Sequence, residues 1–447
     1  MRKLSVAGSL TTDQGVSTMT RKTRSATAAA IGLCIALAAA GCAGGGDGSG
    51  SSDGQGTVTL WTNAMEGRGA QYWKDAAKAY QALHPDVTIK IQSVQNEDLD
   101  GKLQNALNSN SAPDIFLQRG GGKMQAMVDA GQIQALELTD TDRANVGEAA
   151  LEGVSIDGKV YAMPLDTQPE GIYYSKDLFE KAGITSPPTT MDELKDAVAK
   201  LKAIKVAPIA VGAKDAWPAA HWYYNFALRE CSQETMQEAA KSLTFDDPCW
   251  TEAGEDLAEL LETEPFQKGF LTATSQQGAG SSAGMIANHK AAMELMGNWN
   301  PGVIADLTPD KKPLPDLGWF PFPAVPGGKG DPTAIMGGAG GYSLSENAPK
   351  EALGFLRFVV AKEQQEAYAD AFDTIPVNKE AQGVVTEPYN ISALQAFNKA
   401  AYSMQFLDTV YGQNVGNAMN VAVVNLMAGK GSAADIVKDV KAAAEKG

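Results

Sequence analysis

Histidine and cysteine are scarce in this chain of 447 residues, which holds three of the first and four of the second. No Cys-x-x-Cys pair or Cys/His cluster offers the ligand spacing of a zinc site, so we expect neither a metal nor a cofactor. The chain has three histidines, His84, His221 and His289, so few residues could serve as the base of a Ser-His-Asp triad. The segment "GSSAG" at 280–284 fits a GxSxG pattern, but polar and small residues precede it where a buried strand is required. We therefore interpret it as a loop.

Basic residues are also in deficit, with 37 Lys and Arg against 53 Asp and Glu and a formal net charge of −16. An acidic surface repels phosphate backbones, so we expect no nucleic-acid partner. The hydrophobic share of 44% is that of an ordinary globular protein, and the length allows more than one core.

Long apolar runs are absent except near the N-terminus, where Arg21, Lys22 and Arg24 precede the apolar segment 26–40. That segment is too short to span a membrane comfortably and fits the h-region of a signal peptide. It ends in "LAAAGC", which resembles a bacterial lipobox, although Ala39 stands where leucine is usual. We predict a lipoprotein signal peptide over 1–41, lipidation of Cys42 and a flexible Gly/Ser tether over 42–56. An ordinary cleaved signal with an incidental cysteine is the alternative, and translation starts at Met1 or Met19.

These features predict a protein held to the extracytoplasmic face of the cell membrane by lipid alone. Cys34 leaves with the signal and Cys42 is lipidated, so Cys231 and Cys249 are the two cysteines that remain. Outside the cytoplasm such a pair usually forms a disulfide, with two free thiols as the alternative.

Strand and helix patterns alternate after the tether. "TVTLWT" and "DVTIKIQSV" indicate strands, and the residues from 70 to 83 between them place Trp73, Ala76, Ala77 and Tyr80 at helical spacing. Thr190 and Glu193 form a capping-box pattern before the helical segment "MDELKDAVAKLKAI". The alternation predicts an α/β fold in more than one domain.

An ordered set of segments covers nearly the whole chain after the tether: "VTLW", "HPDVTIKI", "APDIFL", "GKVYAMPLDTQPEGIYYSKDLFEKAGI", "NHKAAMELMGNW" and "APKEALGFLRFVVAKEQQEAYA". In order and spacing this set resembles the family-1 extracellular solute-binding proteins of bacterial ABC importers, the relatives of maltose-binding protein. The resemblance implies a two-lobed, type II periplasmic-binding-protein fold with the ligand in a cleft between discontinuous lobes. It places one lobe at 57–164 plus 318–374 and the other at 165–317 plus 375–447.

The resemblance also implies a function without catalysis: the protein captures a mono- or oligosaccharide and delivers it, as a monomer, to the permease subunits of a carbohydrate importer. A sugar ring has apolar faces and a rim of hydroxyl groups. Aromatic side chains stack on the faces, and short polar side chains form hydrogen bonds with the hydroxyls. In open α/β sheets such residues lie in loops after the strands. The candidates in those loops are Asn63, Glu66, Gln118, Arg119, Gly120, Asp166, Gln168, Asp215, Trp217, Asn298, Trp299, Asn300, Gly338, Gly340 and Asp373.

The positions that best match ligand contacts of the family are Glu66, Gln118, Gln168, Asp215, Trp217 and Trp299. Gln118 replaces an aromatic residue of the maltose-binding relative, which puts maltodextrins in doubt as ligands. Two other functions stay open. The same fold can bind a non-sugar solute such as a polyamine, and Asp166 with Glu170 could act as the paired carboxylates of a glycoside hydrolase.

Overall fold

The computed structural model describes residues 56–338 and 340–446. The predicted signal peptide, Cys42 and all but the last residue of the predicted tether lie outside these residues. In the part that is described, no helix is both long and apolar enough to cross a membrane.

The first lobe is built on a five-stranded sheet with the strand order β2-β1-β3-β12-β6. Strands β1, β2 and β3 are parallel, whereas β12 runs antiparallel to both of its neighbours, β3 and β6. Parallel neighbours need crossover connections, which the intervening helices provide. The strands are β1 (Thr57–Thr62), β2 (Thr88–Ser93), β3 (Ile115–Gln118), β6 (Met163–Pro164) and β12 (Gly341–Leu344).

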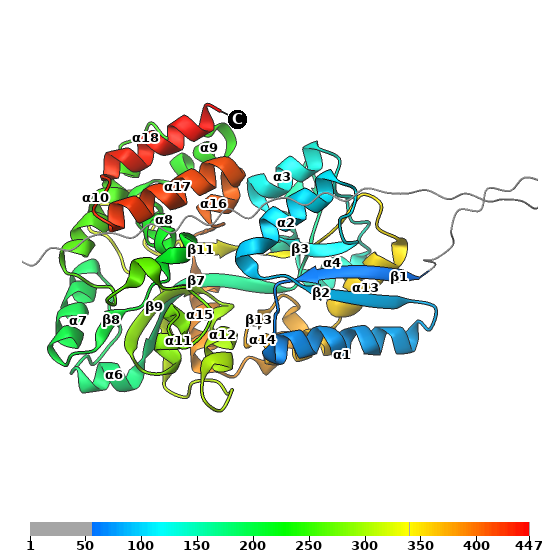
Figure 1. Ribbon diagram of the computed structural model, residues 1–447, viewed down its shortest axis with the longest axis horizontal. Helices are drawn as coiled ribbons and strands as arrows, with labels where there is room; N and C mark the ends of the chain where they lie inside the picture. The colour runs from blue at the N-terminus through cyan, green and yellow to red at the C-terminus, as the bar shows by residue number, and fades with distance from the viewer. Residues whose placement is uncertain (1–55, 339, 447) are drawn as a thin grey trace, which may run out of the picture. The chain divides into compact units, whose positions relative to one another are not determined.

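Helices cover this sheet on both faces, with α1 on one side and α2 and α3 on the other (Figure 1). Helix α1 buries Trp73, Ala76, Ala77 and Tyr80, so the stripe that the sequence predicted faces the core. The helices are α1 (Gly67–Leu83), α2 (Asn96–Asn108), α3 (Gly121–Asp129), α4 (Asp140–Val146), α5 (Glu148–Glu152), α13 (Lys350–Val359) and α14 (Lys362–Phe372), and a small hairpin joins β4 (Ser155–Ile156) to β5 (Lys159–Val160).

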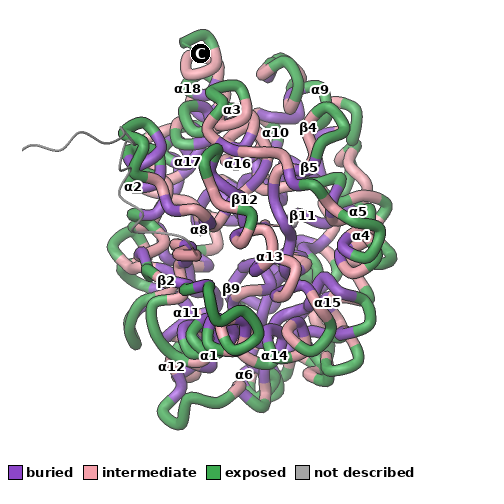
Figure 2. Tube along the Cα trace, turned by 90° about the vertical axis from the view of Figure 1, so that its right-hand side faces the viewer, coloured by how far each residue is buried: buried purple, intermediate pink, exposed green. Residues whose placement is uncertain are grey.

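The second lobe is built on a seven-stranded sheet in which β7 pairs with four other strands. Its path is β14-β11-β7-β9-β8, and β10 and β13 also pair with β7. Strand β9 is buried along its whole length, and Figure 2 shows buried positions in the strands and exposed ones along the outer helices and loops. The strands are β7 (Asp166–Ser175), β8 (Ala207–Ile209), β9 (Ala291–Gly297), β10 (Leu317–Phe320), β11 (Ile335–Gly338), β13 (Ile375–Pro376) and β14 (Ser403–Met404).

Most of the helices belong to this lobe. They are α6 (Lys176–Lys181), α7 (Met191–Ala203), α8 (Trp217–Glu230), α9 (Gln233–Ser242), α10 (Cys249–Glu262), α11 (Ser282–Ala287), α12 (Asn300–Leu307), α15 (Pro388–Lys399), α16 (Leu407–Val410), α17 (Gly412–Met427) and α18 (Ala433–Ala444), with 3-10 turns η1 (Ala213–Asp215) and η2 (Phe270–Thr272). The 3-10 turn η3 (Lys379–Val384) follows β13 but packs against α14 and α4 of the first lobe.

Two helix starts differ in detail from the sequence predictions. At α7 the hydroxyl of Thr190 accepts the Glu193 N–H as expected, but the Glu193 carboxylate accepts from Thr189 instead of Thr190. The "GSSAG" segment is not all loop, because α11 begins at Ser282 with Ser281 as its N-cap.

The disulfide between Cys231 and Cys249 is formed, with the two Cα atoms 5.1 Å apart. It joins the C-terminal end of α8 to the first residue of α10 within the buried core of the second lobe. The prediction that these two cysteines pair is therefore confirmed.

The chain crosses between the two sheets three times, at 164–166, 338–341 and 372–375. The sequence placed residues 318–338 in the first lobe, and the strand pairing corrects this boundary. Trp319 of β10 pairs with Tyr173 of β7. The indole ring of Trp319 packs directly on Gly171, so that a Cβ added to this glycine would lie 2.3 Å from the ring. Strand β11 also pairs with β7, so the first lobe resumes near residue 341.

Candidate functional site

A cavity of about 640 Å³ is lined by residues of both lobes, close to all three crossings. Its volume falls within the range of about 300–1,000 Å³ that is usual for small-molecule sites. A second cavity of about 360 Å³ lies between α1 and β2 within the first lobe alone. Only the larger cavity can contact one ligand from both lobes, so it is the candidate site.

Four aromatic side chains of the second lobe form one corner of this cavity, which we call the aromatic corner: Trp217, His221, Trp299 and Phe406. The rings of Trp217 and Trp299 lie 6.2 Å apart at 61°, and Phe406 lies 5.5 Å from Trp299. Trp222, on the same helix as Trp217, is instead fully buried in the core. Trp217, which the sequence predicted as a ligand contact, thus lines the cavity, whereas its neighbour on the helix does not.

The position of Trp299 depends on the glycine two residues before it. A Cβ on Gly297 would lie 2.2 Å from the indole ring, so the ring packs directly across the glycine backbone at the end of β9. Helix α12 then begins at Asn300, with Pro301 in its first turn. The apolar strand, the glycine and the helix start together hold a partly exposed ring at the cavity.

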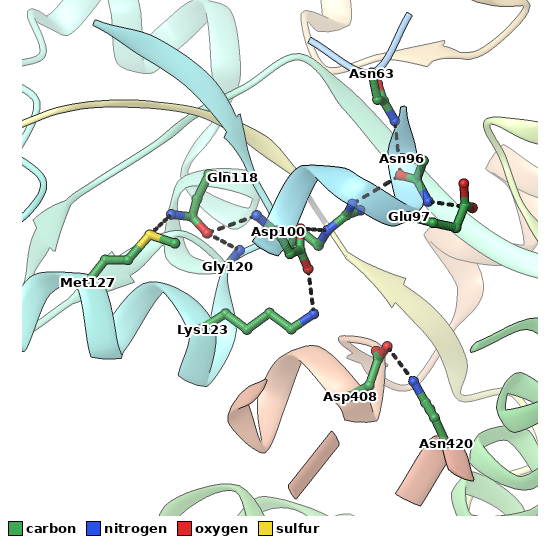
Figure 3. Close-up of polar contacts among 11 residues, drawn as sticks. Asn63, Asn96, Glu97, Asp100, Gln118, Gly120, Lys123, Met127, Asp408 and Asn420 are labelled. Carbon is green, nitrogen blue, oxygen red and sulfur yellow. Dashed lines mark hydrogen bonds and ion pairs between the residues drawn. The ribbon is translucent and has the colours of Figure 1, made fainter. Parts of the chain in front are cut away.

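Charged and amide side chains of the first lobe also line the cavity, and we call them the polar wall. Figure 3 shows the polar contacts among them. Arg119 Nε donates to Asp100 Oδ1 over 2.8 Å, and Lys123 Nζ lies 2.9 Å from the other carboxylate oxygen. Burial acts to raise the pKa of Asp100, but the charges of Arg119 and Lys123 outweigh it and hold the pKa well below its usual value. Arg119 also donates to Asn96, which accepts from Asn63 as well. The wall is therefore fixed before any ligand arrives.

Gln118 lines the cavity, but its amide is already engaged in the turn that follows β3. Its Oε1 accepts from the N–H groups of Arg119 and Gly120, and its Nε2 lies 3.3 Å from the Met127 sulfur. Gly120, with φ of 82°, does not line the cavity. The absence of a side chain at Gly120 instead leaves room for Gln405 of the second lobe, whose Nε2 would lie 2.5 Å from a Cβ there.

Asp166 and Gln168 lie on β7 where the chain first crosses between the lobes. The Asp166 carboxylate accepts from Gln168 Nε2 (3.0 Å) and from the Tyr368 hydroxyl (3.2 Å). No cation is paired with it among the described residues, and burial raises its pKa to about 6. A buried carboxylate with few donors is a ready acceptor for ligand hydroxyls.

Two further carboxylates line the cavity from the second lobe. Asp215 accepts from both the N–H and the hydroxyl of Ser275, at 2.7 and 2.8 Å. Asp408 of α16 accepts from Asn420 of α17. The glycines Gly338 and Gly340 line the cavity at the second crossing, where the backbone lies beside Gln168.

Besides Gly120, four of the predicted contacts do not line the cavity. Glu66 is exposed at the start of α1, and the other three, Asn298, Asn300 and Asp373, are buried beneath the site. Asn298 accepts from Thr374 and Ile375, so it ties the Trp299 turn to the third crossing. Asn300 donates to Glu294, and Asp373 accepts from Tyr389 and Asn390. All three side chains are buried and make hydrogen bonds within the protein, so we no longer expect them to contact ligand directly.

Sequence reasoning missed several lining residues, which are Asn96, Lys123, His221, Gln405, Phe406 and Asp408. Asn96 could have been found, because it follows strand β2 as the other candidates follow theirs. Gln405 and Phe406 follow β14, a strand of two residues that gives no recognisable pattern.

Away from the cavity, Asp177, His289 and Asp316 bring potential metal-ligating atoms within 4.8 Å of one another. His289 Nε2 and Asp316 Oδ1 already form a hydrogen bond of 2.9 Å, and Asp316 also accepts from Ser175. These atoms satisfy one another, so we assign no metal to the group.

The two-lobed fold and the cavity between its crossings define a protein that binds a solute between two lobes. In agreement, residues 64–366 match the family model for the bacterial extracellular solute-binding proteins, and the chain belongs to this family. The melibiose/raffinose/stachyose-binding protein MelE of Bacillus subtilis is 24% identical, with 70% of this chain and 72% of MelE aligned. The multiple sugar-binding protein of Streptococcus mutans is 26% identical, with 74% and 76% aligned.

The fold is also similar to a solved structure from work on xylan utilization by the thermophilic bacterium Caldanaerobius polysaccharolyticus. The TM-score is 0.78 and the identity 27%, and the match covers 87% of this chain and 99% of that one. The match confirms the predicted two-lobed α/β fold.

Proposed function

We propose that the protein captures an oligosaccharide in this cavity for uptake by an ABC importer. The observation that carries the proposal is that one cavity combines the aromatic corner of one lobe with the polar wall of the other. Indole rings stack on the apolar faces of a pyranose, while carboxylates and amides form hydrogen bonds with its hydroxyls. The named sugar ligands of MelE and its relatives support the same class of ligand.

In this proposal the ligand stabilises a closed state, because contacts from both lobes form at once only when the lobes approach each other. The direct ligand contacts are Asn63, Gln118, Arg119, Asp166, Gln168, Asp215, Trp217, Trp299, Gly338 and Gly340 from the sequence, together with the lining residues found in the structure. The permease subunits of the importer would then recognise the closed monomer.

A panel of ligands tests the proposal through tryptophan fluorescence and isothermal titration calorimetry. We expect at least one of melibiose, raffinose, stachyose, lactose or a xylo-oligosaccharide to bind and to change the fluorescence of Trp217 and Trp299. Maltose serves as the comparison, since no aromatic residue stands at position 118. The failure of every sugar, with tight binding of another solute class, contradicts the proposal.

A cationic solute such as a polyamine is the second candidate, and the charge of the cavity favours it. The lining holds five carboxylates against two basic side chains: Glu97, Asp100, Asp166, Asp215 and Asp408 against Arg119 and Lys123. Putrescine and spermidine therefore belong in the same panel. A polyamine would bind more weakly as salt concentration rises, whereas binding of a neutral sugar would change little.

We propose no catalysis in the cavity. Asp166 and Glu170, the carboxylates that could serve a glycoside hydrolase, lie four residues apart on β7, so their Cα atoms are about 13 Å apart in an extended strand. Paired catalytic carboxyl groups are about 5–9.5 Å apart. Both oxygens of Glu170 also accept hydrogen bonds within the protein. Incubation with nitrophenyl glycosides and raffinose should release no product.

Lipid attachment at Cys42 is part of the same proposal and is tested independently of the ligand. Labelling cells of the native host with a palmitate analogue should modify the wild-type protein, and Cys42→Ser should abolish the label. The variant should then appear in the medium instead of the membrane fraction. Equal labelling of both forms contradicts the assignment of Cys42.

A further inference from the structure

A buried pair formed by Glu170 and His221 lies behind the aromatic corner. Glu170 is on β7, and its Oε1 forms a hydrogen bond with His221 Nδ1 on α8. Its Oε2 accepts from Asn225 Nδ2, one helical turn after His221, over 2.6 Å. The side chains of His221 and Glu170 are only 3% and 0% exposed, respectively. The carboxylate thus receives a donor at each oxygen.

These contacts determine which ring nitrogen of His221 carries a hydrogen. A carboxylate only accepts, so Nδ1 must donate to it. The second amide hydrogen of Asn225 goes to the His221 carbonyl over 3.0 Å, which keeps the amide turned toward Glu170. Nε2 lies on the opposite side of the imidazole from Nδ1 and points away from Glu170. In a neutral ring, Nε2 is then a hydrogen-bond acceptor.

The imidazole is also held by the aromatic rings around it. Phe406 stacks on it at 4.7 Å with an interplanar angle of 11°, and the Trp217 ring lies 5.0 Å away. The ring of His221 lines the cavity together with Trp299. Within the part of the chain that the structure describes, no hydrogen bond reaches Nε2.

We propose that His221 is a specificity-determining residue, which accepts a hydrogen bond from a ligand hydroxyl through Nε2, and that Glu170 is its positioning residue. This inference rests on the proposed function, because it concerns the same cavity and a polyhydroxylated ligand. A pyranose ring covered by Trp217 or Trp299 would lie beside the imidazole, because the three rings are within 6.5 Å of one another. A fixed tautomer gives the cavity a preset hydrogen-bond acceptor.

Nitrogen-15 NMR of the histidine rings tests the tautomer. The chain has three histidines, so His221→Asn assigns the signal. In the ligand-free protein we expect hydrogen on Nδ1 of His221, and saturation with raffinose should shift its Nε2 resonance. Hydrogen on Nε2 in the neutral, ligand-free ring overturns the inference whatever the protein binds. Raffinose binding seen by fluorescence with an unmoved Nε2 resonance also overturns it.

Affinity measurements separate recognition from a structural role. The carboxamide of Asn matches the position of Nδ1, and that of Gln reaches the position of Nε2. His221→Asn should therefore weaken raffinose binding about tenfold, the effect of one lost hydrogen bond, and His221→Gln clearly less. His289→Asn, in a histidine outside the cavity, is the matched control and should leave affinity unchanged. Equal losses for His221→Asn and His221→Gln, tracking a fall in melting temperature, contradict the proposal.

A double-mutant cycle tests the role of Glu170. Glu170→Gln should weaken binding in the wild-type background but add less than about twofold in His221→Asn, because Glu170 acts through His221. Additive losses would show that Glu170 acts on its own and overturn its positioning role. If no sugar of the panel binds, the proposed function fails. The NMR measurement on the ligand-free protein and on Glu170→Gln then still decides whether Glu170 holds the hydrogen of His221 on Nδ1.

Discussion

Trp299 shows how one side chain can be partly exposed and yet fixed in place. Its ring packs across the backbone of Gly297, while the asparagines on either side of it point into the protein and bond to Thr374, Ile375 and Glu294. The turn is therefore tied to the third crossing between the lobes, so the ring can respond to movement there.

Trp299→Ala should weaken sugar binding by about 2 kcal/mol, as expected for an aromatic hot spot. Stability should change little, because the ring is only partly buried. Titration calorimetry with the best sugar of the panel and urea unfolding measure the two effects. Trp299→Phe, which keeps a ring, should retain most of the affinity. Normal binding combined with a much lower unfolding midpoint would show that the ring belongs to the core.

Asp166 should make stability depend on pH. Burial raises its pKa to about 6 in the folded protein, so the folded state binds this proton more tightly than the unfolded chain does. Stability is then greatest below the unfolded pKa, near 4, and falls as pH rises through 6. Asp373 and Glu294, with pKa values raised by burial to about 6 and about 7, act in the same direction.

Asp166→Asn should remove part of this dependence and raise the unfolding free energy at pH 8 by about 1–3 kcal/mol. Urea unfolding of both proteins at pH 5 and pH 8 measures the change in unfolding free energy. At pH 5, between the unfolded pKa near 4 and the folded pKa of about 6, the difference between the two proteins should be about half as large. A variant that is equally destabilised at both pH values would show that the packing of the carboxylate matters more than its charge.

At the scale of secondary-structure elements, the turn from β9 into α12 depends on a missing side chain. Gly297→Ala places a methyl group 2.2 Å from the Trp299 ring, so the ring must move. We expect weaker sugar binding and altered tryptophan fluorescence. Gly383→Ala is the control, since nothing lies within 4 Å of a Cβ at that position. Unchanged binding in Gly297→Ala would mean that the ring can shift without losing the ligand.

The disulfide constrains α8 and α10 rather than the cavity. It closes a loop with a sequence separation of 18, and the double variant Cys231→Ser/Cys249→Ser should lose about 3 kcal/mol of stability. Urea unfolding with and without reductant measures this loss, and reductant should not affect the variant. Sugar affinity should stay close to that of the wild type, because neither cysteine lines the cavity.

The sequence predicted elements best where the pattern is local. The buried stripe of α1 and the loops after β1, β3 and β9 follow from periodicity and turn residues. The inward direction of Asn298 could not be predicted in this way, since its partners Thr374 and Ile375 are 76 and 77 residues further along the chain. The same holds for β10, whose place in the second sheet depends on its pairing with β7 and on the space left by Gly171.

At the scale of the whole molecule, the proposed closure should be visible in solution. Small-angle X-ray scattering should give a smaller radius of gyration with a saturating sugar than without it. The lobes are connected by three crossings, so they should move as two bodies about these segments. Trp299→Ala at the same sugar concentration is the control and should close less. An unchanged radius of gyration despite proven binding would mean that the ligand enters a cavity already closed.

The pairing of β12 with β3 has a consequence for how the chain acquires its fold. Ile115 pairs with Leu344, so a span of 344 − 115 = 229 residues separates the two partners. As the chain emerges N-terminus first, β1, β2 and β3 are complete long before β12, and one edge of β3 stays open throughout. Such contacts slow folding, and open strand edges invite aggregation. The interruption of the first lobe therefore leaves one edge of β3 unpaired for most of the time in which the chain is made.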